Sequence, residues 1–408
     1  MQRTIASPVR PDIQHPMLSP ENKSLVVLGV CCMAAALGGR VTDPIVPLLA
    51  DHFGVVVATA ALLSTAFALP YGLSQPVLGP FGDIFGKPSV LRLCTALMAV
   101  ALVAAALVDD LGLLFASRVV AGAAAGGVIP LALALVGDRV EPHRRQVALA
   151  RIVASAMLGQ LVGVACSGVL GAAYGWRAPL WLAGAAGLVA ATAALVFIRR
   201  PTGEAPQAFS VERFMEGYRQ VFANPRAVVC YASVFIEGGS VYGLLPFVAE
   251  TLRQREVGST LEAGFVIGGL GLGGIVFSVA AGSLLRVFAS LTLMKLGGTL
   301  GALGLLGFAI VAPWPFSAAC FLVLGFGFFM LHTGLQNRAV GLAPAARGSA
   351  VALHAFFFFL GQGLAPIVVG PFLHAAGATV TLVACAALLG AVGYTAATLL
   401  ARIDARQA

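Results

Sequence analysis

Long runs of apolar residues alternate with short polar stretches along the whole chain. A helix needs about 20 mostly apolar residues to cross the hydrocarbon core of a bilayer. Twelve segments have about this length, and they cover residues 25–50, 57–79, 90–108, 113–137, 147–170, 178–198, 227–249, 261–285, 289–311, 315–337, 348–371 and 377–400. The short alternating segments that transmembrane β-strands require do not occur. The pattern therefore predicts an all-α membrane protein, because each spanning helix satisfies its own backbone hydrogen bonds.

The longest polar interruption covers residues 199–226 and contains three prolines. It predicts a cytoplasmic linker between an N-terminal six-helix bundle, residues 25–198, and a C-terminal six-helix bundle, residues 227–401. Residues 1–24 and 402–408 are predicted to be cytoplasmic tails. The middle of the linker, residues 210–222, favours a short amphipathic helix on the membrane surface.

The two halves resemble each other at an offset of 202 residues. Gly159–Gln160 aligns with Gly361–Gln362, and Gly168 aligns with Gly370. Internal similarity together with a six-plus-six layout is typical of a duplicated transporter unit. We therefore expect two bundles related by pseudo-two-fold symmetry.

Composition and charge agree with a membrane protein. Apolar residues make up 59% of the chain and charged residues only 10%, whereas soluble proteins carry about 25% charged residues. Twenty of the 25 Lys and Arg residues fall in the tails and in loops on one side, and three fall in the opposite loops. The positive-inside rule then places both tails in the cytoplasm. The net charge of +8 thus indicates contact with anionic lipid rather than with nucleic acid.

The cysteines and the N-terminal residues add no further chemistry. All seven cysteines lie inside apolar runs, without a C-x-x-C pair or a Cys/His cluster of metal-binding spacing. We expect them to be buried side chains, and we expect no metal or other cofactor. The first 23 residues are polar and do not predict a cleavable signal peptide.

The stretch GPFGDIFGKPS, residues 79–89, has glycines and a lysine like a phosphate-binding loop. That loop needs a glycine and a hydroxyl where this chain has Phe81 and Pro88, so a nucleotide site is not expected. The stretch resembles instead the loop between helices 2 and 3 of the major facilitator superfamily, G-x-L-[AS]-D-[RK]-x-G-[RK]-[RK]. The resemblance implies a gating role for Gly79, Gly82, Asp83, Gly86 and Lys87.

In this loop we expect the glycines to permit tight left-handed turns. We expect Asp83 either to cap the third helix or to accept hydrogen bonds from a neighbouring helix end.

Two further stretches resemble motifs of the same family. SRVVAGAAAGG, residues 117–127, resembles the helix-4 motif at Arg118 and Gly122, and in the family this arginine is tied to proton transfer. GQLVGVACSGVL, residues 159–170, resembles the helix-5 motif of the antiporters at Gly159, Gly163 and Gly168, although it lacks the motif's proline. The glycines favour a close helix contact. The chain is most similar to the twelve-span drug:proton antiporter branch, which implies a bacterial inner (plasma) membrane exporter of small organic compounds.

Ionisable residues inside the apolar runs are candidates for proton coupling, because each costs about 2.5–3.5 kcal/mol in hydrocarbon. Glu237 lies near the middle of its segment and is the expected proton carrier; a paired structural glutamate is the alternative. Arg118 and Asp43 are supporting candidates. Arg118 would alternatively snorkel to the outer interface. Arg40 and Asp43 are three residues apart and are expected to form an ion pair. This pair either takes part in proton coupling or serves only to neutralise both charges.

Polar side chains in the apolar runs suggest a substrate cavity. His332 and Gln336 lie one helical turn apart and share a face. The alternative role for such groups is interhelical hydrogen bonding. We expect Phe356–Phe359 to be lipid-facing and packing bulk, with one face lining the cavity as an alternative, and Asp51 and Glu250 to be solvated. The predicted cavity residues are Arg40, Tyr242, His332, Gln336 and His354.

The combined prediction is a monomeric secondary transporter that exchanges protons for small organic compounds by alternating access. The alternative is proton-coupled uptake of a small organic acid, with Arg40 or Arg118 binding its carboxylate. An enzyme is not expected, since the six scattered histidines offer no nucleophile–base pair or metal cluster. A non-transporting receptor is a third class, in which Glu237→Gln would leave substrate accumulation unchanged.

Overall fold

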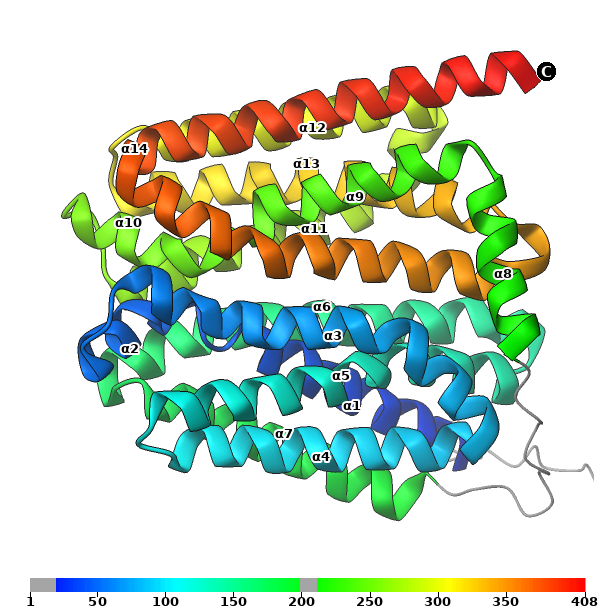
Figure 1. Ribbon diagram of the computed structural model, residues 1–408, viewed down its shortest axis with the longest axis horizontal. Coiled ribbons are helices and arrows are strands. Elements are labelled where there is room, and N and C mark those ends of the chain that lie inside the picture. Colours follow the sequence, from blue (N-terminus) through cyan, green and yellow to red (C-terminus); the bar gives the residue numbers. More distant parts are fainter. Residues whose placement is uncertain (1–19, 199–210, 408) are drawn as a thin grey trace, which may run out of the picture.

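The computed structural model describes residues 20–198 and 211–407, and within these ranges every regular element is a helix. Figure 1 shows them as a stack of long, roughly parallel rods. The long helices are α1 (Pro20–Arg40), α3 (Val57–Phe85), α4 (Lys87–Leu107), α5 (Leu111–Arg139), α6 (Pro142–Tyr174), α7 (Arg177–Phe197), α9 (Arg226–Tyr242), α11 (Thr260–Val287), α12 (Ser290–Ala309), α13 (Trp314–Val340) and α14 (Arg347–Gln407).

Helix α14 consists of two helical parts, because Gly377 interrupts it with φ 80° and ψ 165°. Within the described ranges, eleven helical segments are long and apolar enough to cross a membrane when the α14 segment is counted once. Each of the twelve predicted apolar segments coincides with helix in the structure. The all-α class and the eleven to twelve membrane-capable helices are therefore confirmed.

Short elements complete the fold. Single 3-10 turns η2 (Asp43–Ile45) and η3 (Leu245–Phe247) lead into the short helices α2 (Val46–Phe53) and α10 (Val248–Gln254). The predicted amphipathic helix at residues 210–222 is present as α8 (Val211–Ala223), which packs against α9 and α14. A third 3-10 turn, η4 (Pro344–Ala346), precedes α14.

Breaks in the backbone recur at the offset of 202 residues seen in the sequence. Gly175 has φ 78° between α6 and α7, and Gly377 has φ 80° within α14. Gly54 has φ 63°, and its counterpart Glu256 has φ 56°. The left-handed region costs a residue with a Cβ roughly 1 kcal/mol, so its occupation by Glu256 shows that the repeated turn geometry overrides local preference.

Two pairs of helices touch through backbone at matching positions. A Cβ added to Gly159 on α6 would overlap the carbonyl oxygen of Met33 on α1, and one added to Gly361 on α14 would overlap that of Phe235 on α9. Met33 and Phe235 are themselves 202 residues apart. Only glycine permits these approaches, because any side chain would hold the helices further apart.

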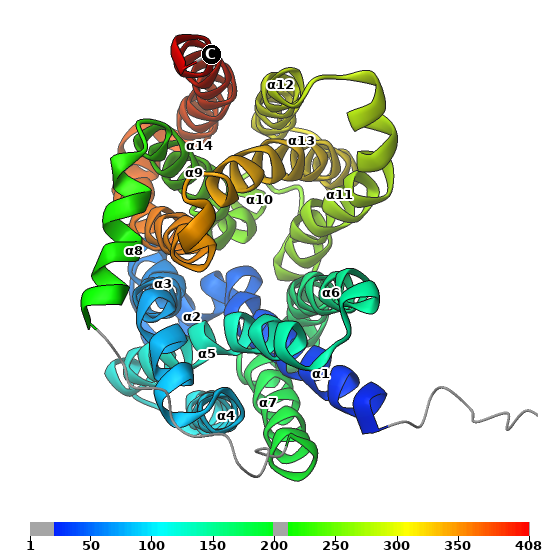
Figure 2. The ribbon, with the colours of Figure 1, turned by 90° about the vertical axis from the view of Figure 1, so that its right-hand side faces the viewer.

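The helices fall into two groups in space. Helices α1 to α7 occupy the lower part of Figure 1 and α9 to α14 the upper part. In the end-on view of Figure 2, α3 lies beside α14 and α6 lies beside α11, and these two pairs form the main contacts between the groups. Gly168 of α6 faces Gly264 of α11, and a Cβ added to Gly168 would lie 2.8 Å from the Gly264 Cα atom.

Short elements at one end of the molecule also join the two groups. There η2 contacts η3, and α2 contacts α10. The guanidinium of Arg253 on α10 pairs with Asp51 on α2 at 3.0 Å and with Glu250 at 2.8 Å. The expectation that Glu250 is solvated is wrong, because its side chain is buried and paired, whereas Asp51 is exposed as expected.

Candidate functional site

A buried ion pair lies at the end of α1. The Arg40 Nη1 atom is 3.5 Å from the Asp43 Oδ2 atom, which confirms the predicted pair. The Ser64 hydroxyl on α3 donates to the other Asp43 oxygen at 2.6 Å. The Asp43 side chain is fully buried, so these contacts replace the water that would otherwise stabilise its charge.

Arg118 on α5 is fully buried, so the snorkelling alternative is wrong. Its guanidinium donates to the Gly38 carbonyl at 2.7 Å and to the Thr42 hydroxyl at 3.5 Å, and it lies 4.5 Å from the centre of the Phe67 ring. Gly122 lets α5 approach the Phe67 backbone. Arg118 therefore fastens α5 to the end of α1, next to the segment that carries Asp43.

Arg40 also connects the two groups of helices. Its Nη2 atom donates to Gln362 Oε1 on α14 at 2.7 Å, and its guanidinium lies 4.2 Å from the centre of the Tyr242 ring on α9. Both partners belong to the second group, whereas Asp43 belongs to the first. Any movement that separates the groups at this point must break the Arg40–Gln362 hydrogen bond.

Glu237 on α9 is a buried acidic side chain with few polar contacts. It is fully buried, and its Oε2 atom lies 3.2 Å from His332 Nδ1 on α13. Its Oε1 atom has no hydrogen-bond partner among the described residues. A buried carboxyl with a single polar neighbour is costly, which makes it a candidate for reversible protonation.

Aromatic rings surround this pair. The His332 ring stacks on Phe328 with centroids 5.3 Å apart and meets Phe358 at 5.0 Å and His354 at 5.1 Å. Neither ring nitrogen of the buried His354 has a hydrogen-bond partner within the described ranges. Phe358 therefore lies inside the protein beside the candidate proton site.

The neighbours of Phe358 are also engaged between helices. Phe357 stacks on Tyr231, and Phe359 packs on Tyr71 across the α3–α14 contact. The packing role expected for this run is therefore present, whereas the lipid-facing orientation is wrong for Phe357, Phe358 and Phe359.

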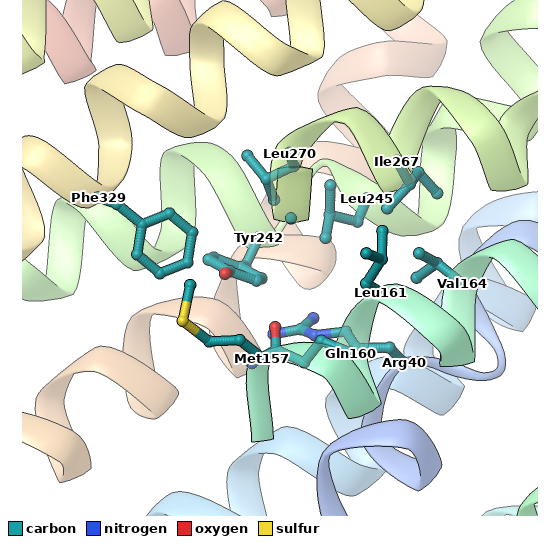
Figure 3. A pocket seen from close by; sticks show the side chains of 11 residues that line it. Arg40, Met157, Gln160, Leu161, Val164, Tyr242, Leu245, Ile267, Leu270 and Phe329 are labelled. Atoms are coloured by element: carbon teal, nitrogen blue, oxygen red, sulfur yellow. The ribbon is translucent and has the colours of Figure 1, made fainter. Parts of the chain in front are cut away.

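A small pocket lies between the two groups of helices. Figure 3 shows Arg40 and Gln160 on one side and Tyr242 and Leu270 facing them. Its full lining is Arg40, Met157, Gln160, Leu161, Val164, Tyr242, Leu245, Ile267, Leu270, Gly271 and Phe329. The wall is apolar apart from the guanidinium, the amide and the phenol, as in sites for amphipathic molecules.

The predicted cavity residues thus separate into two places. Arg40 and Tyr242 line the pocket, whereas His332 and His354 lie in the Glu237 cluster and do not line it. Gln336, one turn beyond His332, is exposed. Gln362 accepts a hydrogen bond from Arg40, and Gln160 lines the pocket. Neither was among the predicted cavity residues, although the 202-residue alignment had paired them.

The motif at residues 79–89 is helical for most of its length. Helix α3 continues to Phe85, and only Gly86, with φ 86°, turns the chain into α4. Gly79 and Gly82 lie within α3, so the expectation of left-handed turns is wrong for these two glycines. Gly82 serves packing instead, because an added Cβ would lie 2.5 Å from Leu131 on α5.

The charged residues of this motif form a small network. Lys87 Nζ lies 2.7 Å from Asp138 at the end of α5 and 3.7 Å from Asp83. The residue at the N-cap of α4 is Gly86, which has no side chain to cap the helix, so the capping role expected for Asp83 is wrong. The network ties the α3–α4 connection to α5.

The helix-5 glycines contact two different helices. Gly159 and Gly163 face the α1 backbone at Met33 and Leu37, and Gly168 faces α11 at Gly264. The first two contacts lie within one group of helices, and the third joins the groups. Among the described residues no group of three or more His, Cys, Asp or Glu side chains is arranged to hold a metal ion.

Comparisons with known proteins place this arrangement in a family. The quinolone resistance protein NorA of Staphylococcus aureus is 25% identical over 356 residues, which cover 86% of this chain and 89% of NorA. The MFS-type transporter YwfA of Bacillus subtilis is 25% identical over 364 residues, which cover 87% of this chain and 86% of YwfA.

Two solved structures share the fold. A bacterial homologue of the human lysosomal transporter Spinster superposes with a TM-score of 0.74 at 16% identity, covering 95% of this chain and 98% of the other. The nucleoside transporter NupG gives 0.75 at 14% identity, covering 94% and 100%. The family model described as Major Facilitator Superfamily matches residues 28–366. The chain therefore belongs to the major facilitator superfamily, as a transporter with membrane-spanning helices.

Proposed function

We propose that this transporter uses the proton gradient to export small organic compounds. The observation that carries the proposal is the buried Glu237 carboxyl, which has one unpartnered oxygen and one imidazole neighbour. Burial favours its neutral form and a nearby cation its charged form, so a change in surroundings drives proton binding and release. Similarity to NorA, whose name records quinolone resistance, supports export.

The two groups of helices act as bundles that rock about the central site. Residues 25–198 and 227–401 form the bundles, joined by the linker at 199–226. The equal 202-residue spacing of glycine contacts, 3-10 turns and left-handed residues supports pseudo-two-fold symmetry between them. In this proposal the monomer lies in a bacterial inner membrane with both tails in the cytoplasm.

The pocket between the bundles holds the substrate. Its walls come from both bundles, as alternating access requires, and its apolar lining suits an amphipathic molecule. The Arg40–Gln362 hydrogen bond and the Tyr242 contact cross this site, so they belong to one of the two end states. Asp43 and Arg118 support the site by setting the charge and the position of the end of α1.

The remaining motifs serve the movement of the bundles. Lys87, Asp83 and Asp138 hold the α3–α4 connection against α5, and breaking this network accompanies the change of state. Gly168 permits the close α6–α11 contact around which the bundles tilt.

The direction of transport tests the proposal. Proteoliposomes with inside-out protein and an acidic lumen are expected to accumulate an amphipathic probe such as ethidium, because protons leave as the compound enters. A panel of neutral and acidic probes extends the assay. Accumulation of a carboxylic acid in right-side-out vesicles driven by inward proton flow, with none of these compounds exported, would instead establish the uptake alternative.

The uptake alternative has one structural argument in its favour. Arg40 lines the pocket and presents a guanidinium that suits a carboxylate. Arg118 does not line the pocket, and its guanidinium is engaged by backbone carbonyl and hydroxyl oxygens within the first bundle. The organic acid of that alternative would therefore bind Arg40 and displace Gln362.

The position of the pocket gives a second prediction. Gly271→Trp is expected to raise the KM for transported compounds at least about tenfold, since an indole fills most of the space beside Leu161. Gly271→Ala is the matched control, because an added Cβ lies 3.5 Å from Leu161, an ordinary contact. Efflux kinetics in proteoliposomes measure both. Equal KM values in the two variants would place the substrate elsewhere.

A further inference from the structure

The Glu237 side chain is fully buried, so its carboxyl is not in direct contact with solvent in this structure. His332 supplies the one hydrogen-bonding contact that the described residues make with this carboxyl, between Nδ1 and Oε2 at 3.2 Å. The His332 side chain is 18% exposed, whereas that of Glu237 is 0% exposed, so His332 is the more accessible member of the pair.

The surroundings of His332 hold the imidazole ring in place. Phe328 stacks on one face with the ring planes 19° apart, and Phe358 packs edge-on at 5.0 Å. Apolar rings offer no competing hydrogen bond, so the Nδ1 atom keeps its contact with Glu237. An imidazole fixed in this way can take a proton at one nitrogen and release one from the other.

The other ionisable groups around this ring are few. From α14, His354 faces it with centroids 5.1 Å apart, and from α9 Tyr242 packs on the same Phe328 and Phe358 rings. Arg40 of α1 approaches this cluster at the Tyr242 ring, with its guanidinium 4.2 Å from the ring centre. Glu237 is thus the acidic group in contact with His332 among the described residues.

We propose that His332 is the proton-transfer residue that loads and unloads Glu237, an inference that rests on the proposed proton coupling. A proton from water joins Nε2 of the neutral ring and forms an imidazolium. The Nδ1 proton then passes to Oε2, which leaves a neutral carboxyl group and a neutral ring that carries its proton on Nε2. Unloading reverses these two transfers and restores the original tautomer, so the proton count balances over a cycle.

The test follows the protonation of Glu237 directly, without a substrate. The full-length protein in detergent is subjected to a pH jump, and time-resolved infrared spectroscopy records the carbonyl stretch of the protonated carboxyl group. The band that disappears in Glu237→Gln is that of Glu237. His332→Ala is expected to slow the rise of this band about 100-fold, as removal of a general acid–base group does.

Chemical rescue separates proton transfer from a structural role. Added imidazole is expected to restore the rate in His332→Ala, because it occupies the space of the missing ring. His332→Phe keeps the aromatic packing and is expected to be slow without rescue. His374→Ala, which changes an exposed histidine, is the matched control and should behave as wild type.

The possible outcomes distinguish this inference from the proposed function. A Glu237 band that rises equally fast in wild type, His332→Ala and His332→Phe overturns the relay and leaves the proton carrier intact. Slow protonation in His332→Ala that imidazole does not accelerate also counts against the relay. If no band is lost in Glu237→Gln at any pH, Glu237 does not titrate and the proposed carrier itself is wrong.

Discussion

Proton-driven transport is expected to fall to the background of protein-free vesicles when Glu237 is replaced by Gln. The amide has nearly the same shape and keeps a hydrogen-bonding atom for His332, but it neither binds nor releases a proton at physiological pH. Exchange of compound across the membrane without a gradient should persist, since a neutral side chain mimics the protonated carrier. Proteoliposome assays of accumulation and of exchange measure the two activities separately.

The matched control for this variant is Glu216→Gln on the exposed face of α8. It makes the same chemical change outside the core and should transport like wild type. Because the amide removes the cost of burying a carboxylate, thermal unfolding of Glu237→Gln should occur no earlier than that of wild type. Unchanged proton-driven accumulation in Glu237→Gln would refute the carrier assignment and would favour a non-transporting role or a different coupling residue.

Gly159→Ala and Gly361→Ala are each expected to lower the free energy of unfolding by about 3 kcal/mol, the upper range for overpacking. The added Cβ would overlap the carbonyl oxygen of Met33 or of Phe235, and a backbone oxygen cannot rotate away as a flexible side chain can. The helix pairs α1–α6 and α9–α14 must then separate. Thermal unfolding in detergent and the yield of monodisperse protein measure the effect.

Gly137→Ala provides the control with the opposite sign. An added Cβ meets nothing within 4 Å at this helical position in α5. Alanine favours helix over glycine by up to about 1 kcal/mol, so this variant should be slightly more stable than wild type. Equal destabilisation by all three substitutions would show that helix geometry, rather than the close backbone contacts, explains the glycines.

The positions of the helices follow from local properties of the chain. Each apolar segment is long enough to cross a bilayer, and its backbone has no stable alternative to the helix in lipid. The Arg40–Asp43 ion pair was predictable for the same kind of reason, since residues three apart on a helix are neighbours. The contact between α6 and α11 at Gly168 likewise follows from the space that a small residue leaves.

The side-chain partners of the candidate site depended on tertiary structure. Glu237 and His332 are 95 residues apart, and Arg40 and Gln362 are 322 residues apart. The local sequence does not predict which face of a helix packs against which neighbouring helix, because these helices are apolar on nearly all sides. For the same reason the sequence did not identify which members of Phe356–Phe359 face the protein interior.

The sequence by itself determined the all-α class and the twelve apolar segments, because these depend on the composition and length of single segments. Only the tertiary structure decided that Arg118 is sealed inside the first group of helices, that Asp83 pairs with Lys87 instead of capping α4, and that His332 contacts Glu237. Those outcomes depend on the rotation and spacing of packed helices, which side chains far apart in the chain determine together.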